Sequence, residues 1–311
     1  MSNVNIKRTV ENIKANTTVY STVIEIIVNG IQAIDETKRK DGQVLVKIQR
    51  SAQTEIGDGL PDIVGFEIQD NGIGFNNTHR NSFDTLYSDQ KITEGGKGFG
   101  RFIGFKYFDD LNITSVYKDI DCLKTRCFSM GKEHEIIVDE KIFLSDSSDT
   151  GSIVKLSALK KGHMFEKKLS TVARNLAERL LPYFITNDYI CPDIILSEHD
   201  SSESINLNDF VKNELSAVIK EIKVDKNIFS LESTNRHEEF LVRIFKFYSP
   251  RNQKSRISLV AHKREVSGSA LQKYIPEFED EFFEKDKNGD NDRDRNYIIK
   301  AYVFGNYLDR N

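Results

Sequence analysis

The stretch VGFEIQDNGIGF, residues 64–75, combines a predicted strand with a glycine-containing turn in this chain of 311 residues. Val64, Phe66 and Ile68 alternate with other residues, which is typical of a strand with one buried face. The strand runs directly into Asp70 and two nearby glycines, which permit positive φ and the close approach of a ligand to the backbone. An aspartate in this place can accept a hydrogen bond from an exocyclic amine such as that of adenine. The alternative is a plain Asp-Asn-Gly hairpin turn.

Upstream of this stretch, residues 17–38 predict a helix. Its apolar residues are spaced for one buried face: Val19, Val23, Ile26, Ile27, Ile31 and Ile34. Glu25, Asn29, Gln32 and Ala33 share another face, because positions three, four, seven or eight residues apart align along a helix. A helix can expose such residues to solvent, so this segment alone does not separate a site from a solvated surface. The alternating residues Val44, Val46 and Ile48 predict a strand after it.

Downstream, a polar segment without clear periodicity, residues 76–94, precedes GGKGFGR at 95–101. This glycine-rich loop leads into a predicted helix at 101–108, so its amides and the helix N-terminus make a natural phosphate site. Lys97 and Arg101 add positive charge. The loop lacks the Gly-Lys-Ser/Thr ending of a Walker A motif, and no strand runs into it as a Rossmann motif requires. A flexible glycine loop is the alternative.

The remaining pattern predicts two domains, 1–165 and 166–311. Strands are expected at 112–117, 135–138 and 152–156, and again at 240–248, 257–266 and 297–304. A long amphipathic helix is expected at 165–184, and the acidic, serine-rich segment 197–208 is expected to be an exposed loop. Phe282 and Phe283 are expected to pack a helix end. The acidic segment 286–292 resembles an EF-hand loop, but its glycine and its twelfth residue, Tyr297, do not fit one.

The composition indicates a soluble cytoplasmic protein. Charged residues make up 30% and the net charge is −4, so there is no global basic field for nucleic acid. Cys122, Cys127 and Cys191 lack metal-ligand spacing and fit a reducing cytosol better than a disulfide framework or a zinc site. The N-terminus lacks the apolar core of a signal peptide, and the apolar runs are far shorter than the roughly 20 residues that span a bilayer.

Taken together in their order, the motifs resemble the GHKL ATPase superfamily. The order is ExxxN at Glu25, DxGxG at Asp70, a polar segment, GxGxG at Gly96 and TGS ending at Ser152. Members include Hsp90, MutL, gyrase B, MORC proteins and sensor histidine kinases. The resemblance covers the first half with its motifs and the second half more loosely. It implies an α+β Bergerat fold, a two-layer sandwich in which helices cover a mixed sheet, followed by a smaller α/β transducer-like domain.

The resemblance implies a role for each matching residue. Glu25 would be the general base for the attacking water, and Asn29 the ligand that joins Mg²⁺ to the phosphates of ATP. Asp70 would bind the adenine amine, with Gly74 shaping the base pocket, and residues 76–94 would form a flexible lid. The implied ATP-binding set also includes Ala33, Gly72, Gly96, Lys97, Gly98, Phe99, Gly100, Arg101 and Ser152.

Two positions depart from the family pattern. Gln32 stands where Hsp90 and MutL have Asp, which removes or alters the contact of that carboxylate. Ser152 stands where Thr is usual and keeps the hydroxyl. Glu25 separates hydrolases from histidine kinases, which usually have Asn there, so hydrolysis is favoured over phosphotransfer.

The expected function is Mg²⁺-dependent ATP binding with slow hydrolysis that drives lid closure and homodimerisation, as in Hsp90 and MutL. The alternatives are a histidine-kinase-like phosphotransfer domain and a non-hydrolysing, nucleotide-gated interaction module. A client protein or nucleic acid is not identified, and an effector region is expected to follow Asn311. Residues 257–266 resemble the strand-turn-strand of the transducer domain, but no residue, Lys263 included, is assigned as its phosphate-contacting lysine.

Overall fold

The computed structural model describes residues 6–11, 17–52, 59–84, 100–214, 218–233, 236–251, 253–285 and 294–310. They form two compact units. The first comprises the described residues up to Arg179 and those of Ile190–Asn208, and the second comprises Leu180–Tyr189 and the described residues from Asp209 onward. The division lies later than the expected boundary at 165, because β7 (Asp193–Glu198) returns to pair in parallel with β1 (Gln43–Arg50).

The first unit contains an eight-stranded mixed sheet with the strand order β5-β4-β3-β6-β2-β1-β7-β8. All of its neighbouring strands are antiparallel except β1 and β7. The further strands are β2 (Ile63–Asp70), β3 (Phe108–Asp119), β4 (Cys122–Met130), β5 (Ile137–Leu144), β6 (Gly151–Leu159) and β8 (Ser204–Asn206). The helices are α1 (Ile6–Glu11), α2 (Val19–Thr37), α3 (Asn77–Asp84) and α4 (Gly100–Tyr107). Two more, α5 (Leu169–Ile185) and α6 (Leu207–Asp209), begin in the first unit and end in the second.

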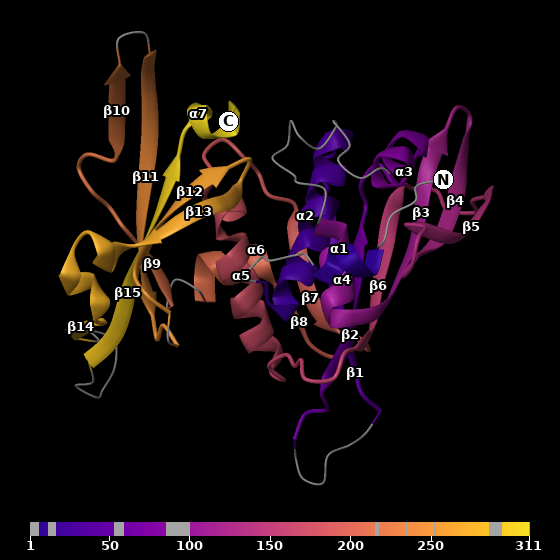
Figure 1. The fold of residues 1–311 in the computed structure, drawn as a ribbon, viewed down its shortest axis with the longest axis horizontal. Coiled ribbons are helices and arrows are strands. Elements are labelled where there is room, and N and C mark those ends of the chain that lie inside the picture. Colours follow the sequence, from indigo (N-terminus) through magenta and orange to yellow (C-terminus); the bar gives the residue numbers. More distant parts are fainter. Residues whose placement is uncertain are drawn as a thin grey trace. The chain divides into compact units, whose positions relative to one another are not determined.

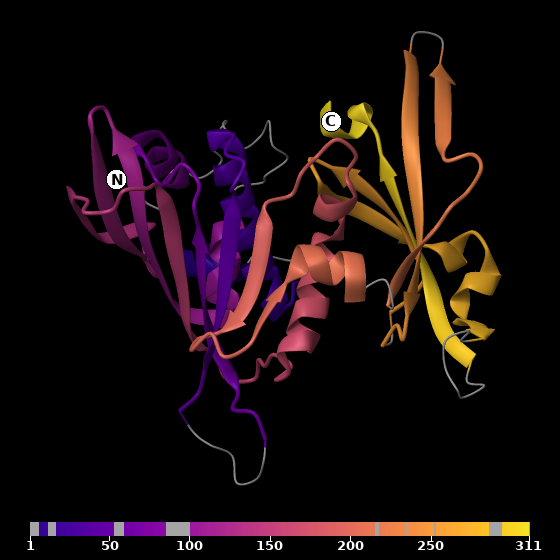
Figure 2. The same ribbon diagram turned by 180° about the vertical axis from the view of Figure 1, so that it is seen from behind.

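Helix α2 is the central helix of the first unit. Val23, Ile27 and Ile31 are fully buried on one side of it, as the apolar spacing predicts. The helix packs on β1, β2 and α4, and the views from front and back show α1, α2 and α4 on the same face of the sheet (Figures 1 and 2). The other side of α2 is therefore free to line a cavity above the sheet.

The second unit is built on a seven-stranded sheet. Its main path is β10-β11-β15-β12-β13, with β9 pairing with β11 and β14 pairing with β15. The bounds are β9 (Ile219–Ile222), β10 (Ile228–Ser233), β11 (Arg236–Tyr248), β12 (Arg256–Ala261), β13 (Arg264–Ala270), β14 (Phe282–Lys285) and β15 (Asp294–Phe304). Short helical segments occur at Phe210–Glu214, Leu271–Lys273, Pro276–Glu279 and Asn306–Arg310, the last being α7.

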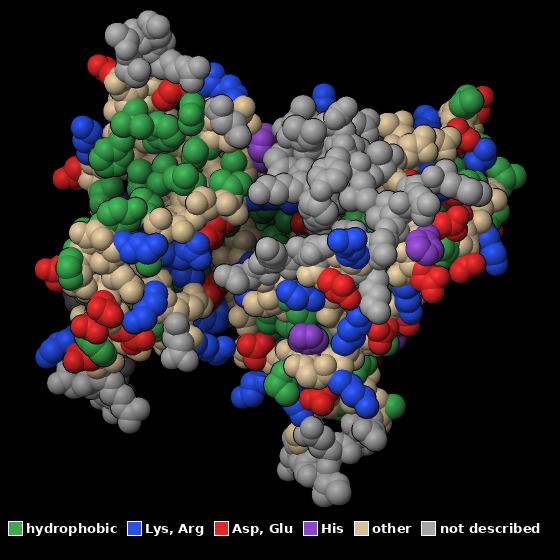
Figure 3. Space-filling model, viewed as in Figure 1, with side chains coloured by type: hydrophobic (Ala, Val, Ile, Leu, Met, Phe, Trp, Pro, Cys, Tyr) green, Lys and Arg blue, Asp and Glu red, His purple; other side chains and the backbone are tan. Residues whose placement is uncertain are grey.

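The strand-turn-strand expected at 257–266 is confirmed as the β12–β13 hairpin. Its two turn residues, His262 and Lys263, have φ of 48° and 62°, which matches the positive φ that both central residues of a type I′ turn require. The ammonium group of Lys263 lies 3.8 Å from the ring centroid of Tyr189. Hydrophobic side chains gather on the face of this unit seen in Figure 3, and Phe229 and Leu231 of β10 are 47% and 65% exposed.

Several local predictions are corrected by the structure. The strand expected at 135–138 is β5, which begins at Ile137 and pairs with β4, a strand that was not predicted. The segment 197–208, expected to be a loop, contains β8, which forms the edge of the sheet beside β7. Phe282 and Phe283 belong to strand β14 rather than to a helix end, and Phe282 stacks on Tyr297 of β15. In each case the corrected segment pairs with the strand next to it in the sequence, and this pairing goes beyond what local propensity indicates.

Among the described residues, no helix combines the length and the apolar character needed to cross a membrane.

Candidate functional site

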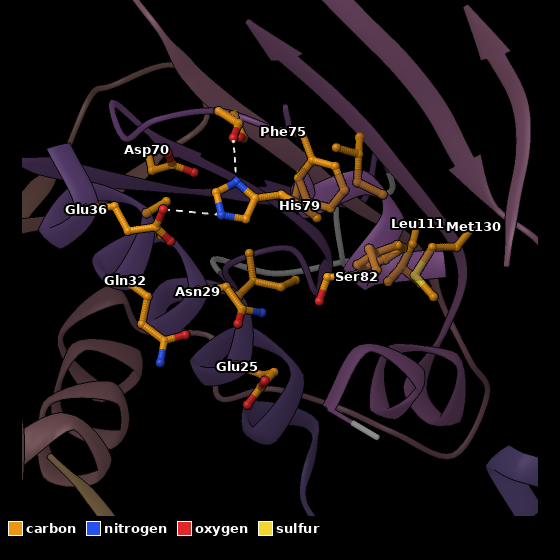
Figure 4. A pocket seen from close by; sticks show the side chains of 18 of the residues that line it. Glu25, Asn29, Gln32, Glu36, Asp70, Phe75, His79, Ser82, Leu111 and Met130 are labelled. Atoms are coloured by element: carbon orange, nitrogen blue, oxygen red, sulfur yellow. Dashed lines mark hydrogen bonds and ion pairs between the residues drawn. The ribbon is translucent and has the colours of Figure 1, made fainter. Parts of the chain in front are cut away.

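A cavity of about 340 Å³ lies in the first unit and is lined by residues from α2, β2, α3, β3, β4 and β6. Glu25, Asn29, Gln32 and Glu36 line it from successive turns of α2, and Figure 4 shows them in this order along the helix. The apolar side of α2 faces the core, so the line of polar residues can face the cavity. The helix face that the sequence left ambiguous is therefore the wall of a cavity.

Asp70 lies at the end of β2 and also lines the cavity. Its side chain is at the point where β2 pairs with β6, opposite Ser152, and the residue is only 9% exposed. The Gly72 N–H donates a hydrogen bond to Asp70 Oδ1 at 2.8 Å. Burial raises the pKa of Asp70 to about 7, although backbone N–H groups of Gly72 and Ser152 oppose the rise. The carboxyl is thus poised between its two protonation states near neutral pH.

The glycines after Asp70 allow the turn to lie close to its neighbours. A Cβ on Gly72 would stand 2.5 Å from the carbonyl carbon of Ala33, because the turn rests on α2. The Ile73 N–H donates to the Ala33 carbonyl at 3.0 Å. Gly74 has φ of +78°, and its Cβ would stand 2.1 Å from the Val116 carbonyl oxygen. Gly74 and Ala33 line the cavity. The missing side chain of Gly72 lets the turn rest directly on α2.

Ser115 of β3 joins the motifs and was not singled out by the sequence. It is 1% exposed, accepts a hydrogen bond from the Phe75 N–H at 2.8 Å and donates to the Gly151 carbonyl at 2.9 Å. The oxygen atoms of the Ser115 and Ser152 hydroxyls lie 3.0 Å apart. Ser115 therefore ties the turn after Asp70 to the start of β6. No local motif marks it, because its partners belong to distant segments.

Helix α3 forms a further wall through His79, Ser82 and Phe83. His79 Nε2 lies 3.2 Å from a carboxylate oxygen of Glu36, and His79 Nδ1 lies 3.3 Å from the Gly74 carbonyl oxygen (Figure 4). The helix occupies the first part of the segment expected to be a flexible lid without periodic structure. Residues 85–94 of that segment lie outside the described residues.

A buried arginine holds the start of α3 against the sheet. Arg126 of β4 is 1% exposed and donates to the Phe75 carbonyl at 2.6 Å, the Asn76 carbonyl at 3.0 Å and Asn77 Oδ1 at 2.6 Å. Its guanidinium carbon also lies 4.8 Å from the ring centroid of Tyr117. These contacts determine where the chain leaves the Asp70 turn and enters α3. The sequence offered no signal for Arg126, because β4 was not predicted.

The other half of the cavity is apolar. Ile26, Phe75, Phe83, Leu111, Ile113, Met130 and Val154 line it. The ring centroids of Phe75 and Phe83 are 5.2 Å apart in an edge-to-face arrangement. Both centroids lie within 6 Å of the ring centroid of Phe128. A polar side and an apolar side in one cavity suit a flat ring that carries a few hydrogen-bonding groups.

The glycine-rich loop is only partly described. Gly96, Lys97, Gly98 and Phe99 lie outside the described residues. The helix expected after the loop is confirmed as α4, which begins at Gly100 and packs on α2. Arg101 lies in its first turn, and its side chain is outside the description. The phosphate role of these six residues remains a prediction.

The comparisons bear on the fold. No family model matches the sequence, and no curated protein matches it significantly. The N-terminal domain of a DNA repair protein is similar in structure, with a TM-score of 0.51 at 15% identity over 96% of this chain and 86% of that chain. The chain therefore shares the fold of that domain, and the mixed α+β class predicted from the sequence is confirmed.

Two further structures are less similar. The ATPase region of Saccharomyces cerevisiae topoisomerase II bound to ICRF-187 has a TM-score of 0.48 at 11% identity, over 92% of this chain and 73% of that chain. The 43K ATPase domain of Thermus thermophilus gyrase B with an aminocoumarin has a TM-score of 0.41 at 12% identity, over 91% and 75%. The assignment of the fold rests on the DNA repair domain.

Proposed function

We propose that this chain binds ATP with Mg²⁺ in the cavity of its first unit and hydrolyses it slowly. One observation carries the proposal. Glu25 and Asn29 on α2, Asp70 at the end of β2 and Ser152 on β6 come from distant parts of the chain, yet all four line the same cavity. These are the residues to which the motifs assign the base, the metal ligand and the adenine contacts, and the fold brings them together.

The Asp70 end of the cavity suits adenine in particular. An ionised carboxylate only accepts hydrogen bonds, and adenine presents an amine donor at the position where guanine has a carbonyl acceptor. Asp70 would pair with that amine and repel the guanine carbonyl. Ser152 lies opposite Asp70 in the sheet and offers a hydroxyl to the same base. The apolar residues Phe75 and Ile113 supply surface for the faces of the ring.

The residues present also fit Mg²⁺ that arrives with the nucleotide. Magnesium prefers oxygen ligands, keeps several waters and is bound through one or two protein groups plus substrate phosphates. Asn29 offers an amide oxygen on the cavity wall, with Glu25 one turn away. Within the described part of the chain, no group of three or more His, Cys, Asp or Glu side chains is placed to hold a metal alone. Bound Mg²⁺ would neutralise phosphate charge.

Glu25 would take a proton from the attacking water, and Asn29 would orient the phosphate end of ATP. A positioned general base contributes roughly 10²–10⁴-fold to a rate. Glu25→Gln keeps the size of the side chain but removes the base, so it should lower turnover by about this factor while nucleotide binding stays within about twofold. Glu203→Gln, which alters an exposed carboxylate on the loop before β8, is the matched control.

The decisive measurement is calorimetric titration with ATP and with GTP in the presence of Mg²⁺, together with phosphate release over time. Binding of ATP and not GTP, with turnover that depends on Glu25, supports the proposal. Absence of ATP binding at millimolar nucleotide would refute it. Normal turnover by Glu25→Gln would refute the assignment of the base and leave binding intact.

We further propose that ATP acts as a conformational switch that closes a lid and brings two copies of the chain together. The support is that α3 supplies part of the cavity wall and is joined to α2 through His79 and Glu36, so a ligand in the cavity can bias its position. Light scattering with a non-hydrolysable ATP analogue should show a mass twice that of the nucleotide-free protein. An unchanged mass at saturating analogue would contradict the dimer.

A further inference from the structure

The hydroxyl of Thr22 has no hydrogen-bond partner among the described residues. Thr22 lies on α2, is 2% exposed and lines the cavity. Buried hydroxyl groups in proteins nearly always have a partner, because losing water without a replacement is destabilising. This polar group therefore calls for a partner that the described residues do not supply.

Thr37 of the same helix shows how such a hydroxyl is ordinarily satisfied. Its Oγ1 donates to the carbonyl of Ile34, one turn earlier, at 2.7 Å. The carbonyl groups of the turn before Thr22 could serve in the same way, but Thr22 makes no such bond. A valine, which has nearly the same shape, would fill the site of Thr22 without a buried unpaired hydroxyl.

The position of Thr22 relative to Glu25 suggests the missing partner. Residues three apart on a helix have Cβ atoms about 5–6 Å apart on the same face. A water that hydrogen-bonds to two oxygen atoms spans about twice 2.8 Å. One water can therefore lie between the Thr22 hydroxyl and the Glu25 carboxylate, and both residues line the cavity. Asn29, seven residues after Thr22, continues the same line.

We propose that Thr22 is a positioning residue that holds the attacking water against Glu25. This inference rests on the proposed ATPase function. The water oxygen bonds to the γ-phosphorus while the bond from that phosphorus to the β–γ bridging oxygen breaks. Glu25 takes the proton of the water, and the products are ADP and inorganic phosphate. Thr22 itself is unchanged, because its hydroxyl only orients the lone pair of the water.

The test compares Thr22→Val, which removes the hydroxyl, with Thr22→Ser, which keeps it. Thr37→Val is the matched control, since it removes a satisfied threonine hydroxyl from the same helix outside the cavity. Three quantities are measured for each: kcat for ATP, affinity for a non-hydrolysable analogue and the thermal midpoint without nucleotide. Should Thr22→Val not fold, Thr22→Ala against Thr22→Ser makes the same comparison.

Thr22→Val should lower kcat about tenfold or more, with analogue affinity within about twofold and a thermal midpoint equal to or above that of wild type. Thr22→Ser should restore most of kcat. Thr37→Val should keep kcat and lower the midpoint. If Thr22 had only a structural role, Thr22→Val would lower the thermal midpoint and the analogue affinity together with kcat. That result would overturn the inference.

Two further results separate the inference from the proposed function. If Thr22→Val keeps kcat within about twofold of wild type while Glu25→Gln is inactive, the inference fails and the ATPase proposal stands. If wild type releases no phosphate, both fail, because there is then no water to position.

Discussion

Asp70 makes the protein sensitive to pH in a way that can be measured. Its carboxyl lies in a 9% exposed position, and burial raises its pKa from 3.8 to about 7. Between about pH 4 and pH 7 the folded chain therefore holds a proton on Asp70 that the unfolded chain has released. The contribution of Asp70 to the free energy of unfolding should therefore fall as the pH rises through this window, because the ionised form is disfavoured in the folded state.

The size of this effect follows from the shift. About three pKa units at 1.36 kcal/mol each give a loss of at most about 4 kcal/mol between pH 4 and pH 8. Asp70→Asn has no proton to lose, and its amide oxygen can still accept the hydrogen bond from Gly72 N–H. The variant should therefore be more stable than wild type at pH 8, by an amount that shrinks to near zero, or reverses, at pH 4.

Urea unfolding of both proteins without nucleotide, at a series of pH values, measures this difference directly. Subtracting the wild-type curve from that of Asp70→Asn cancels the titration of groups common to both. A difference that does not change with pH would refute the argument, since it would mean that Asp70 ionises equally well in the folded and the unfolded chain.

The same group should couple pH to binding. Adenosine is the suitable probe, because it has no phosphate to titrate. Its amine favours the ionised carboxylate, so affinity should fall by up to about tenfold for each pH unit below the pKa of Asp70. Asp70→Asn should bind adenosine weakly at every pH, without this dependence. Equal affinity of wild type and Asp70→Asn would show that Asp70 does not contact the base.

Three other predictions follow from the site. Asn29→Ala should remove the dependence of ATP affinity on Mg²⁺, measured by titration with and without a chelator; a retained dependence would place the metal elsewhere. Gly74→Ala should cost more than about 1 kcal/mol of stability and abolish ATP binding, because φ is +78° and the new Cβ would meet the Val116 carbonyl; normal urea unfolding would contradict this. Ser115→Ala should cost about 1–3 kcal/mol and weaken ATP binding, because it leaves the part-buried Phe75 N–H and the Gly151 carbonyl without their hydroxyl partner; a stability within about 0.5 kcal/mol of wild type would contradict it.

Local sequence determined the elements that carry the site. The apolar spacing of residues 17–38 predicted α2, the alternation of residues 64–68 predicted β2, and the glycines after Asp70 predicted a close turn. These patterns are local because helix and strand periodicity depend on neighbouring residues. The motif order also predicted a mixed α+β fold, and the chain shares the fold of the N-terminal domain of a DNA repair protein.

Tertiary structure decided which face of α2 lines a cavity and what closes that cavity. Arg126 and Ser115 hold the Asp70 turn through contacts with residues 36 to 51 positions away, and Leu111 and Met130 reach the cavity from separate strands. The periodicity of the sequence does not mark such side chains, because strand pairing, and not spacing along the chain, determines their partners. The raised pKa of Asp70, and the Thr22 hydroxyl that has no partner among the described residues, arise likewise from burial, which only the folded chain creates.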